Sequence, residues 1–150
     1  MKNEAEFKTA FKKSVKAQGG FAISLAAPML AGIPDLYVIM PGFMPVLLEA
    51  KWMKELSLKP KKIPYSKLQG YYLNEIHNIQ SKAAMGLIGY KYSGFTLCAL
   101  LPPNVFNVNV YTTLSVILEN KLFNVKQLFI NSAIPRLNFV EKMDKLPKEA

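Results

Sequence analysis

The chain of 150 residues contains one cysteine, one histidine and one arginine, and each scarcity excludes a kind of site. A single cysteine, Cys98, provides no internal disulfide and fits a reducing compartment, and with only His77 beside it the chain lacks the ligands of a zinc finger. The lone histidine also argues against a catalytic triad. No apolar run is long enough to span a membrane, and the charged N-terminus does not resemble a signal peptide. We therefore expect a cytoplasmic protein without membrane contact.

Acidic residues are also few, 10 against 19 basic ones, and the formal net charge of +9 favours a polyanionic partner. Every basic residue except Arg136 is a lysine. Lysine acts as a point charge toward phosphate, whereas arginine forms paired hydrogen bonds to base edges. The composition therefore favours contact with a phosphate backbone over the reading of a base sequence.

Hydrophobic periodicity and turn residues predict a single α/β domain over residues 1–150. The expected core has the order α-β-β-β-α-β, with a helix at 3–18, strands at 21–27, 33–40 and 45–52, a helix at 66–84 and a strand at 86–92, and a further strand follows at 95–101. Beyond it we expect a helix at 112–120, a strand at 125–131 and a charged tail at 141–150.

Two of the few carboxylates fall inside apolar strands, Asp35 in the first strand of a predicted hairpin and Glu49 in the second. A lone charge in such a strand is costly unless it is paired or binds a metal. Asp35 and Glu49 are equally distant from Gly42, so a hairpin that turns there places them opposite each other, with Cβ atoms about 4.5–5.5 Å apart. Two such carboxylates can share a hard cation such as Mg²⁺.

Lys51 lies two residues beyond Glu49, so the strand period turns its ammonium group to the same face. The spacing is compatible with two arrangements. One is a metal site with a cation beside it, and the other is a purely structural ion pair of Lys51 with Glu49 or Asp35.

The segments GIPDL at 32–36 and LEAK at 48–51 resemble the signature of the PD-(D/E)XK nuclease superfamily, in the form of VRR-NUC-type and phage Holliday-junction-resolvase-like enzymes. The resemblance covers residues 3–92, or 3–101 with the next strand. It implies a restriction-endonuclease-like core, with a mixed central sheet flanked by helices, followed by a C-terminal extension over 102–150. It also implies Mg²⁺-dependent hydrolysis of DNA, with Mn²⁺ as an alternative metal, in a phage or bacterial protein.

In that family Asp35 and Glu49 would be the main metal ligands and the carbonyl of Ala50 would complete the set. Lys51 would hold or activate the attacking water and stabilise charge on the phosphate. The resemblance raises the chance that Gln69, otherwise a solvated helix residue, lies beside the pocket and contacts Lys51, water or phosphate.

A glutamate of the first helix would add an outer ligand. At about 100° per residue, Glu4 falls within the apolar stripe of Phe7, Phe11 and Val15, whereas Glu6 points away from it. We therefore favour Glu4, with Glu6 as the fallback. A glutamate in the first turn is also favourable to the helix dipole alone.

Several lysines are expected to contact the DNA backbone, two on the first helix and five on an exposed, mobile segment at 54–67, namely Lys12, Lys16, Lys54, Lys59, Lys61, Lys62 and Lys67. Five tyrosines either stack on unpaired bases or, as is more common at such spacings, pack in the core, namely Tyr65, Tyr71, Tyr72, Tyr90 and Tyr92.

We expect a Mg²⁺-dependent endodeoxyribonuclease that selects branched DNA such as a Holliday junction by shape. A resolvase cuts two strands symmetrically and so would be a homodimer. The apolar segments 105–111 and 114–130 would supply its interface or, equally, further sheet and packing. The alternatives are a repair, replication or restriction nuclease acting on linear or flapped DNA, and a basic DNA-binding protein without catalysis.

Overall fold

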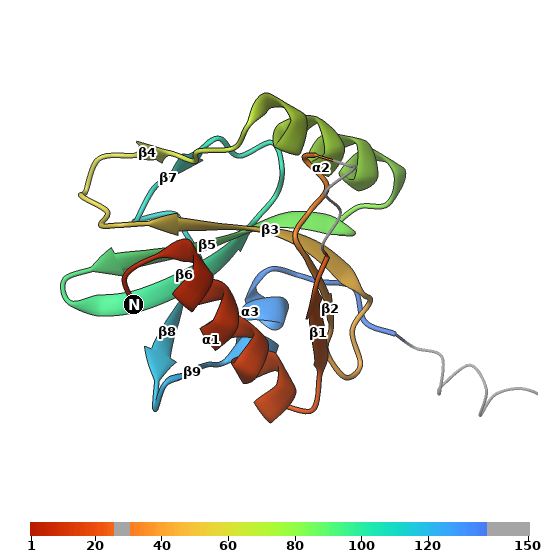
Figure 1. Ribbon diagram of the computed structural model, residues 1–150, viewed down its shortest axis with the longest axis horizontal. Helices are drawn as coiled ribbons and strands as arrows, with labels where there is room; N and C mark the ends of the chain where they lie inside the picture. Colours follow the sequence, from red (N-terminus) through yellow and green to blue (C-terminus); the bar gives the residue numbers. More distant parts are fainter. Residues whose placement is uncertain (26–30, 138–150) are drawn as a thin grey trace, which may run out of the picture.

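The computed structural model describes residues 1–25 and 31–137 and arranges them as a seven-stranded mixed sheet with helices on it (Figure 1). The elements are α1 (Glu4–Ala17), β1 (Phe21–Ser24), β2 (Leu36–Ile39), β3 (Val46–Met53), β4 (Lys61–Lys62), α2 (Lys67–Ile79), β5 (Ala84–Tyr92), β6 (Phe95–Leu101), β7 (Asn107–Val108), β8 (Val116–Glu119), β9 (Leu122–Phe123) and α3 (Val125–Asn131). The predicted α/β class with a mixed sheet is confirmed. None of the helices described is long and apolar enough to cross a membrane.

The strand order of the large sheet is β1-β2-β3-β5-β6-β8-β9. Strands β2 and β3 form the predicted antiparallel hairpin, with Leu36 paired to Leu48. Strand β5 lies parallel to β3 because the chain between them crosses over through α2, and Glu49 pairs with Gly86. In Figure 1, β3 and β5 run across the middle of the view, with α1 below them and α2, β4 and β7 above.

The larger core lies on the face of the sheet that α1 covers. The helix begins after Asn3, whose side chain accepts a hydrogen bond from the Glu6 N–H, and it ends before Gly19, which has a φ of 82°. Phe7 and Phe11 are fully buried against this face, as the spacing of apolar residues predicted. The Phe7 ring packs on the backbone of β5 at a glycine, Gly89.

A second, smaller core lies on the opposite face, beneath the segment that joins β3 to α2. Its buried residues come from that segment, from β5 and β6, and from β7, and they are Leu56, Ile63, Ile88, Tyr90, Ala99 and Val108. The two-stranded β4–β7 ribbon holds the segment in place, with Lys61 paired to Val108. This arrangement matters for the site because the side chains of Glu49 and Lys51 lie on the same face of the sheet as this smaller core.

Two predicted elements beyond residue 101 are wrong. The helix expected at 112–120 is strand β8, which pairs with β6 and contains the β-branched pair Val116 and Ile117. The strand expected at 125–131 is helix α3. It forms because the Asn124 side chain accepts a hydrogen bond from the Gln127 N–H at 3.0 Å, and because the buried residues Val125, Leu128 and Phe129 recur at helical spacing.

The second helix is shorter than the predicted range of 66–84. It ends at Ile79, which is 84% exposed, and its one fully buried residue is Leu73. The chain from Ala84 onward pairs with β3 instead, so strand pairing overrides the helical pattern there. The predicted tail at 141–150 and the last residues of the strand expected at 21–27 lie outside the described residues.

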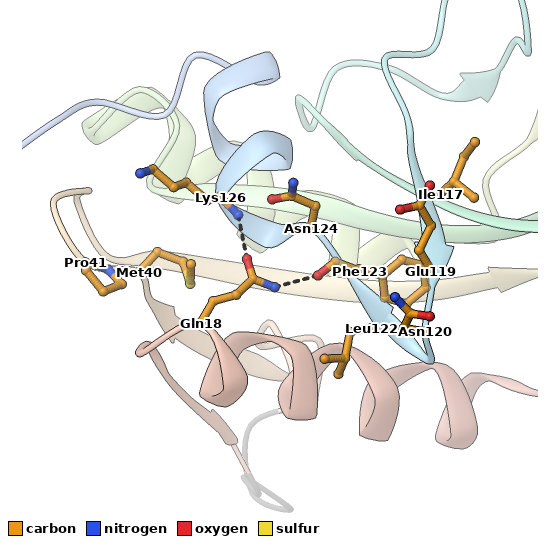
Figure 2. A pocket seen from close by; sticks show the side chains of 10 residues that line it. All are labelled: Gln18, Met40, Pro41, Ile117, Glu119, Asn120, Leu122, Phe123, Asn124 and Lys126. Atoms are coloured by element: carbon orange, nitrogen blue, oxygen red, sulfur yellow. Dashed lines mark hydrogen bonds between the residues drawn. The ribbon is translucent and has the colours of Figure 1, made fainter.

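The described part of the C-terminal extension is an integral part of the fold. The Gln18 amide donates to the carbonyl of Phe123 at 2.6 Å and accepts from the Lys126 N–H at 3.1 Å, as the dashed lines in Figure 2 show. Buried Ser14 accepts from the Phe123 N–H at 2.8 Å. These bonds join the end of α1 to β9 and α3, so much of the apolar sequence at 114–130 serves as sheet and packing, as does Val108 within 105–111.

Two glycine substitutions should have opposite effects on the free energy of unfolding, one at the contact of α1 with β5 and one on α2. A Cβ at position 89 would lie 2.7 Å from the Phe7 ring, so Gly89→Ala should lower the free energy of unfolding by about 1–3 kcal/mol. Gly70 in α2 has no atom within 4 Å of such a Cβ, so Gly70→Ala should raise it by up to about 1 kcal/mol. Urea denaturation measures both, and wild-type stability of Gly89→Ala would contradict the described packing.

Candidate metal and catalytic site

Asp35 and Glu49 meet where the β2–β3 ladder ends. The last pair of the ladder is Leu36 with Leu48, and continuing that register by one residue places Asp35 across from Glu49, the arrangement expected from a hairpin about Gly42. Asp35 immediately precedes β2 rather than lying within it, which corrects the strand expected at 33–40. The ladder stops because Pro34 has no N–H to contribute and because the Ala50 N–H donates to Asp35 Oδ1 at 3.1 Å.

Glu49 is a buried carboxyl group on β3, with 3% of its surface exposed. Burial, and then the negative charge of Asp35, raises the pKa of Glu49 to about 7, while Lys51 and the backbone N–H of Asp35 act in the opposite direction. The ammonium of Lys51 lies 3.8 Å from Oε1 of Glu49. The other oxygen, Oε2, is buried without a hydrogen-bond partner among the described residues. The carboxyl group is therefore only partly satisfied by the protein.

Helix α1 contributes two charged side chains to this region. Glu4 is half-buried and its negative charge also acts to raise the pKa of Glu49, whereas Glu6 is exposed and its Oε2 accepts a hydrogen bond from the Lys2 N–H at 2.8 Å. Lys8 Nζ lies 3.1 Å from Asp35 Oδ2. Sequence reasoning missed Lys8, although it follows Glu4 by four residues and therefore shares its side of the helix.

The backbone carbonyl of Ala50 points toward the same edge as Asp35. In β3 the Leu47 N–H donates to Ala83 on the β5 side, so Ala50, which is an odd number of residues away, faces β2 instead. The N–H and C=O of one strand residue point to the same neighbouring strand, and the Ala50 N–H reaches Asp35. The carbonyl of Ala50 therefore faces the gap beyond the end of the ladder.

These donors fit a hard divalent cation. Within residues 1–25 and 31–137, no group of three or more His, Cys, Asp and Glu side chains lies close enough to hold a metal by itself. The available donors are two carboxylates and a backbone carbonyl, all of them oxygen. Mg²⁺ commonly takes one or two carboxylates and keeps several waters. The unpartnered Oε2 of Glu49 is the acceptor that such an ion would satisfy.

Gln69 caps a helix in the structure. Its side-chain oxygen accepts from the Ser66 N–H at 2.9 Å, and the Ser66 hydroxyl accepts from the Gln69 N–H at 3.1 Å. This capping box stabilises the first turn of α2. The proposed contact of Gln69 with Lys51, water or phosphate stays a prediction.

The predicted DNA-contacting lysines are at the surface with one exception. Lys12 is half-buried and donates to the Ser24 hydroxyl at 2.8 Å, whereas the exposed ones are Lys16, Lys54, Lys59, Lys61, Lys62 and Lys67. The segment at 54–67, expected to be a mobile loop, is anchored by buried Leu56 and Ile63 and by the pairing of β4 with β7. The lysines of this segment therefore extend from a backbone that packing and strand pairing fix in place.

Tyr65 is a further residue of this region that sequence reasoning did not assign to it. Its hydroxyl occupies the place where a Cβ at Gly86 would lie, and Gly86 is the strand partner of Glu49. The hydroxyl is buried without a hydrogen-bond partner in the described part of the chain. Burial and the charge of Glu49 raise the pKa of Tyr65, which keeps the phenol protonated as a donor. Only the crossover through α2 brings Tyr65 beside β5.

One sizeable cavity lies away from the carboxylates. It has a volume of about 610 Å³ and is lined by Gln18, Met40 and Phe123 among others (Figure 2). Gln18 caps the C-terminal end of α1, whereas Glu4 lies in its first turn, so the 14-residue helix separates the two by about 20 Å. Comparison of the chain with protein-family models and with curated proteins finds no match.

The raised pKa of Glu49 predicts how its substitution changes stability with pH. A folded-state pKa above the unfolded one means that the contribution of Glu49 to stability is greatest at low pH and is lost as pH rises through about 7. With chelator present, Glu49→Gln should therefore be more stable than wild type by roughly 1–3 kcal/mol near pH 8, and this gain should shrink toward about pH 5.

Urea denaturation at both pH values measures the effect. Glu75→Gln, at an exposed site on α2, is the control and should stay within about 0.5 kcal/mol of wild type throughout. A Glu49→Gln variant that is destabilised equally at both pH values would show that the carboxylate has only a structural role.

Proposed function

We propose that this chain is a metal-dependent endodeoxyribonuclease of the PD-(D/E)XK type that hydrolyses phosphodiester bonds of branched or otherwise structured DNA. The observation that carries the proposal is the buried, partly unsatisfied Glu49 opposite Asp35, with Lys51 at 3.8 Å. A bound Mg²⁺ or Mn²⁺ would neutralise charge on the phosphate and polarise its oxygens. Asp35, Glu49 and the Ala50 carbonyl would hold the ion, with Glu4 as an outer ligand.

The reaction needs a water to attack phosphorus and one P–O ester bond to break, which leaves a phosphate on one new end and a hydroxyl on the other. Lys51 extends from the same face as Glu49, so its ammonium would orient the water and stabilise negative charge on the phosphate. Lys8 balances the charge of Asp35 from the helix side. Both cations therefore lie where an incoming phosphate adds negative charge.

A purely structural role explains these groups less well. The pairs Lys8–Asp35 and Lys51–Glu49 are what a structural role would require. However, a carboxylate that serves only to pair Lys51 has no need for a second carboxylate opposite it, which raises its pKa. Nor does such a role account for an unpartnered oxygen in a buried position.

The charge distribution supports DNA as the substrate. The segment that follows β3 carries exposed lysines on an anchored backbone, and it leads directly from the proposed catalytic strand. Lysines contact phosphates without selecting a base sequence, which fits recognition of DNA shape. A protein acting on phage or bacterial DNA would work in the cytoplasm, where Cys98 stays reduced.

Cleavage assays test the catalytic assignment. With Mg²⁺, wild type should cut a four-way junction or plasmid, and Asp35→Asn, Glu49→Gln and Lys51→Ala should each lower the rate by roughly 100-fold or more, because each removes a group held at the scissile phosphate. Glu75→Gln should cut as wild type does. DNA left intact by wild type under every metal condition, or full activity of Asp35→Asn and Glu49→Gln, would refute the assignment of nuclease activity.

The substrates also separate the alternatives within this class. Paired symmetric nicks on the junction would identify a resolvase, which would act as a homodimer. Faster cleavage of linear or flapped DNA would indicate a repair, replication or restriction nuclease. Metal-independent binding without cleavage would indicate a non-catalytic DNA-binding protein.

The lysine segment predicts how binding depends on salt. Lys59→Gln and Lys61→Gln together should weaken duplex binding and reduce the slope of log K against log salt by about 0.9 for each phosphate that the variant no longer neutralises. Lys121→Gln with Lys126→Gln, at exposed positions between β8 and β9 and on α3, is the matched control and should leave the slope unchanged. Fluorescence anisotropy in chelator measures both, and equal slopes for the two pairs would contradict the assigned surface.

A further inference from the structure

A second pocket lies beside the proposed catalytic site, on the face of the sheet that α2 covers. Its volume is about 340 Å³, within the range of small-ligand sites. The β4–β7 ribbon and the first turns of α2 form its walls, and Lys62, Lys67, Tyr65, Tyr71 and Phe106 are among its lining residues. Tyr65 connects this pocket to the site, because its hydroxyl lies against Gly86, the strand partner of Glu49.

Two exposed aromatic side chains belong to this pocket. Tyr71 on α2 is 56% exposed and Phe106, next to β7, is 58% exposed. Each is held by its surroundings: Tyr72 contacts the Tyr71 ring edge-on with ring centroids 5.4 Å apart, and the Phe106 carbonyl accepts from the Ile63 N–H at 2.9 Å. The Tyr71 ring and the Phe106 backbone are therefore held in place, and both aromatic side chains are accessible to a ligand.

The charges at the pocket match a phosphate. Lys62 and Lys67 line it, both are exposed, and no carboxylate is among its lining residues. Gly70, also in the lining, contributes no side chain, and a Cβ there would meet no atom within 4 Å. The pocket thus combines open space, two cations and two aromatic faces.

We propose that this pocket binds an unpaired nucleotide of the DNA strand beside the scissile phosphate, with its base on Tyr71 and Phe106 and its phosphate on Lys62 and Lys67. A base can stack on a protein ring only when it has left the duplex stack. Within a duplex, the bases expose only their edges in the grooves, and the backbone exposes its phosphates. The substrate class is therefore DNA with unpaired nucleotides, such as a branch point, flap or single strand. This inference deepens the proposed nuclease function and rests on it.

Binding of labelled oligonucleotides in chelator tests the pocket without catalysis. We compare a single strand with a blunt duplex of the same length, by fluorescence anisotropy. Tyr71→Ala with Phe106→Ala should weaken single-strand binding roughly tenfold or more and duplex binding less than about twofold, because only the unpaired strand stacks. Tyr71→Phe, which keeps the ring, should bind as wild type does. Lys62→Gln with Lys67→Gln should weaken binding of both DNAs.

The chain offers a matched control for exposed aromatic surface. Phe95 is 57% exposed and Tyr111 is 74% exposed, and neither is among the residues that line this pocket. Phe95→Ala with Tyr111→Ala should therefore leave both affinities unchanged. If the double alanine variant at Tyr71 and Phe106 unfolds at a lower temperature than wild type, the single variants replace it.

The outcomes separate this inference from the nuclease itself. If wild type cuts DNA in a manner dependent on Asp35 and Glu49 while the variants at Tyr71 and Phe106 bind single strands normally, the pocket assignment is wrong and the nuclease stands. If those variants lose single-strand binding selectively but wild type never cuts DNA, the pocket binds unpaired DNA as proposed, and both the nuclease and the position of the pocket beside a scissile phosphate are wrong. Equal losses on both DNAs would also overturn the stacking role.

Discussion

Burial of the Glu49 carboxyl group at the end of the β2–β3 ladder is the constraint on which the proposed site depends. The sheet places this group against Asp35, and the resulting desolvation and repulsion raise its pKa to about 7. Lys51 and Lys8 offset part of that cost, one on each carboxylate. Oε2 of Glu49 nevertheless remains buried without a hydrogen-bond partner among the described residues, so a bound cation would stabilise the ionised carboxylate.

The same crossover that makes β3 and β5 parallel builds the surroundings of this site. The chain leaves β3 with its lysines, pairs briefly with β7, and turns into α2 through the segment that holds Tyr65. A phosphate backbone guided by those lysines would meet Glu49, Tyr65 and Tyr71 along this stretch of chain, with Asp35 and Phe106 contributed by neighbouring segments. In our proposal, charge, stacking and metal chemistry are therefore coupled by a single connection.

Local patterns predicted much of the core. The apolar stripe of α1, the hairpin about Gly42 and the turn at Ser93 and Gly94 all depend on neighbouring residues, and the structure agrees with each. Beyond residue 101 the local patterns failed. There β8 and α3 are stabilised by pairing with β6 and by the core around Phe129, which are contacts between distant parts of the chain.

The sequence alone determined the pair of carboxylates, because a hairpin register follows from turn position and strand period. It also determined that Glu4 rather than Glu6 lies on the inward side of the first helix, through helical periodicity. Only the tertiary structure decided that Lys8 pairs with Asp35 and that Tyr65 lies over Gly86 beside Glu49. Both depend on how a helix and a crossover pack against the sheet, and no local spacing encodes such long-range contacts.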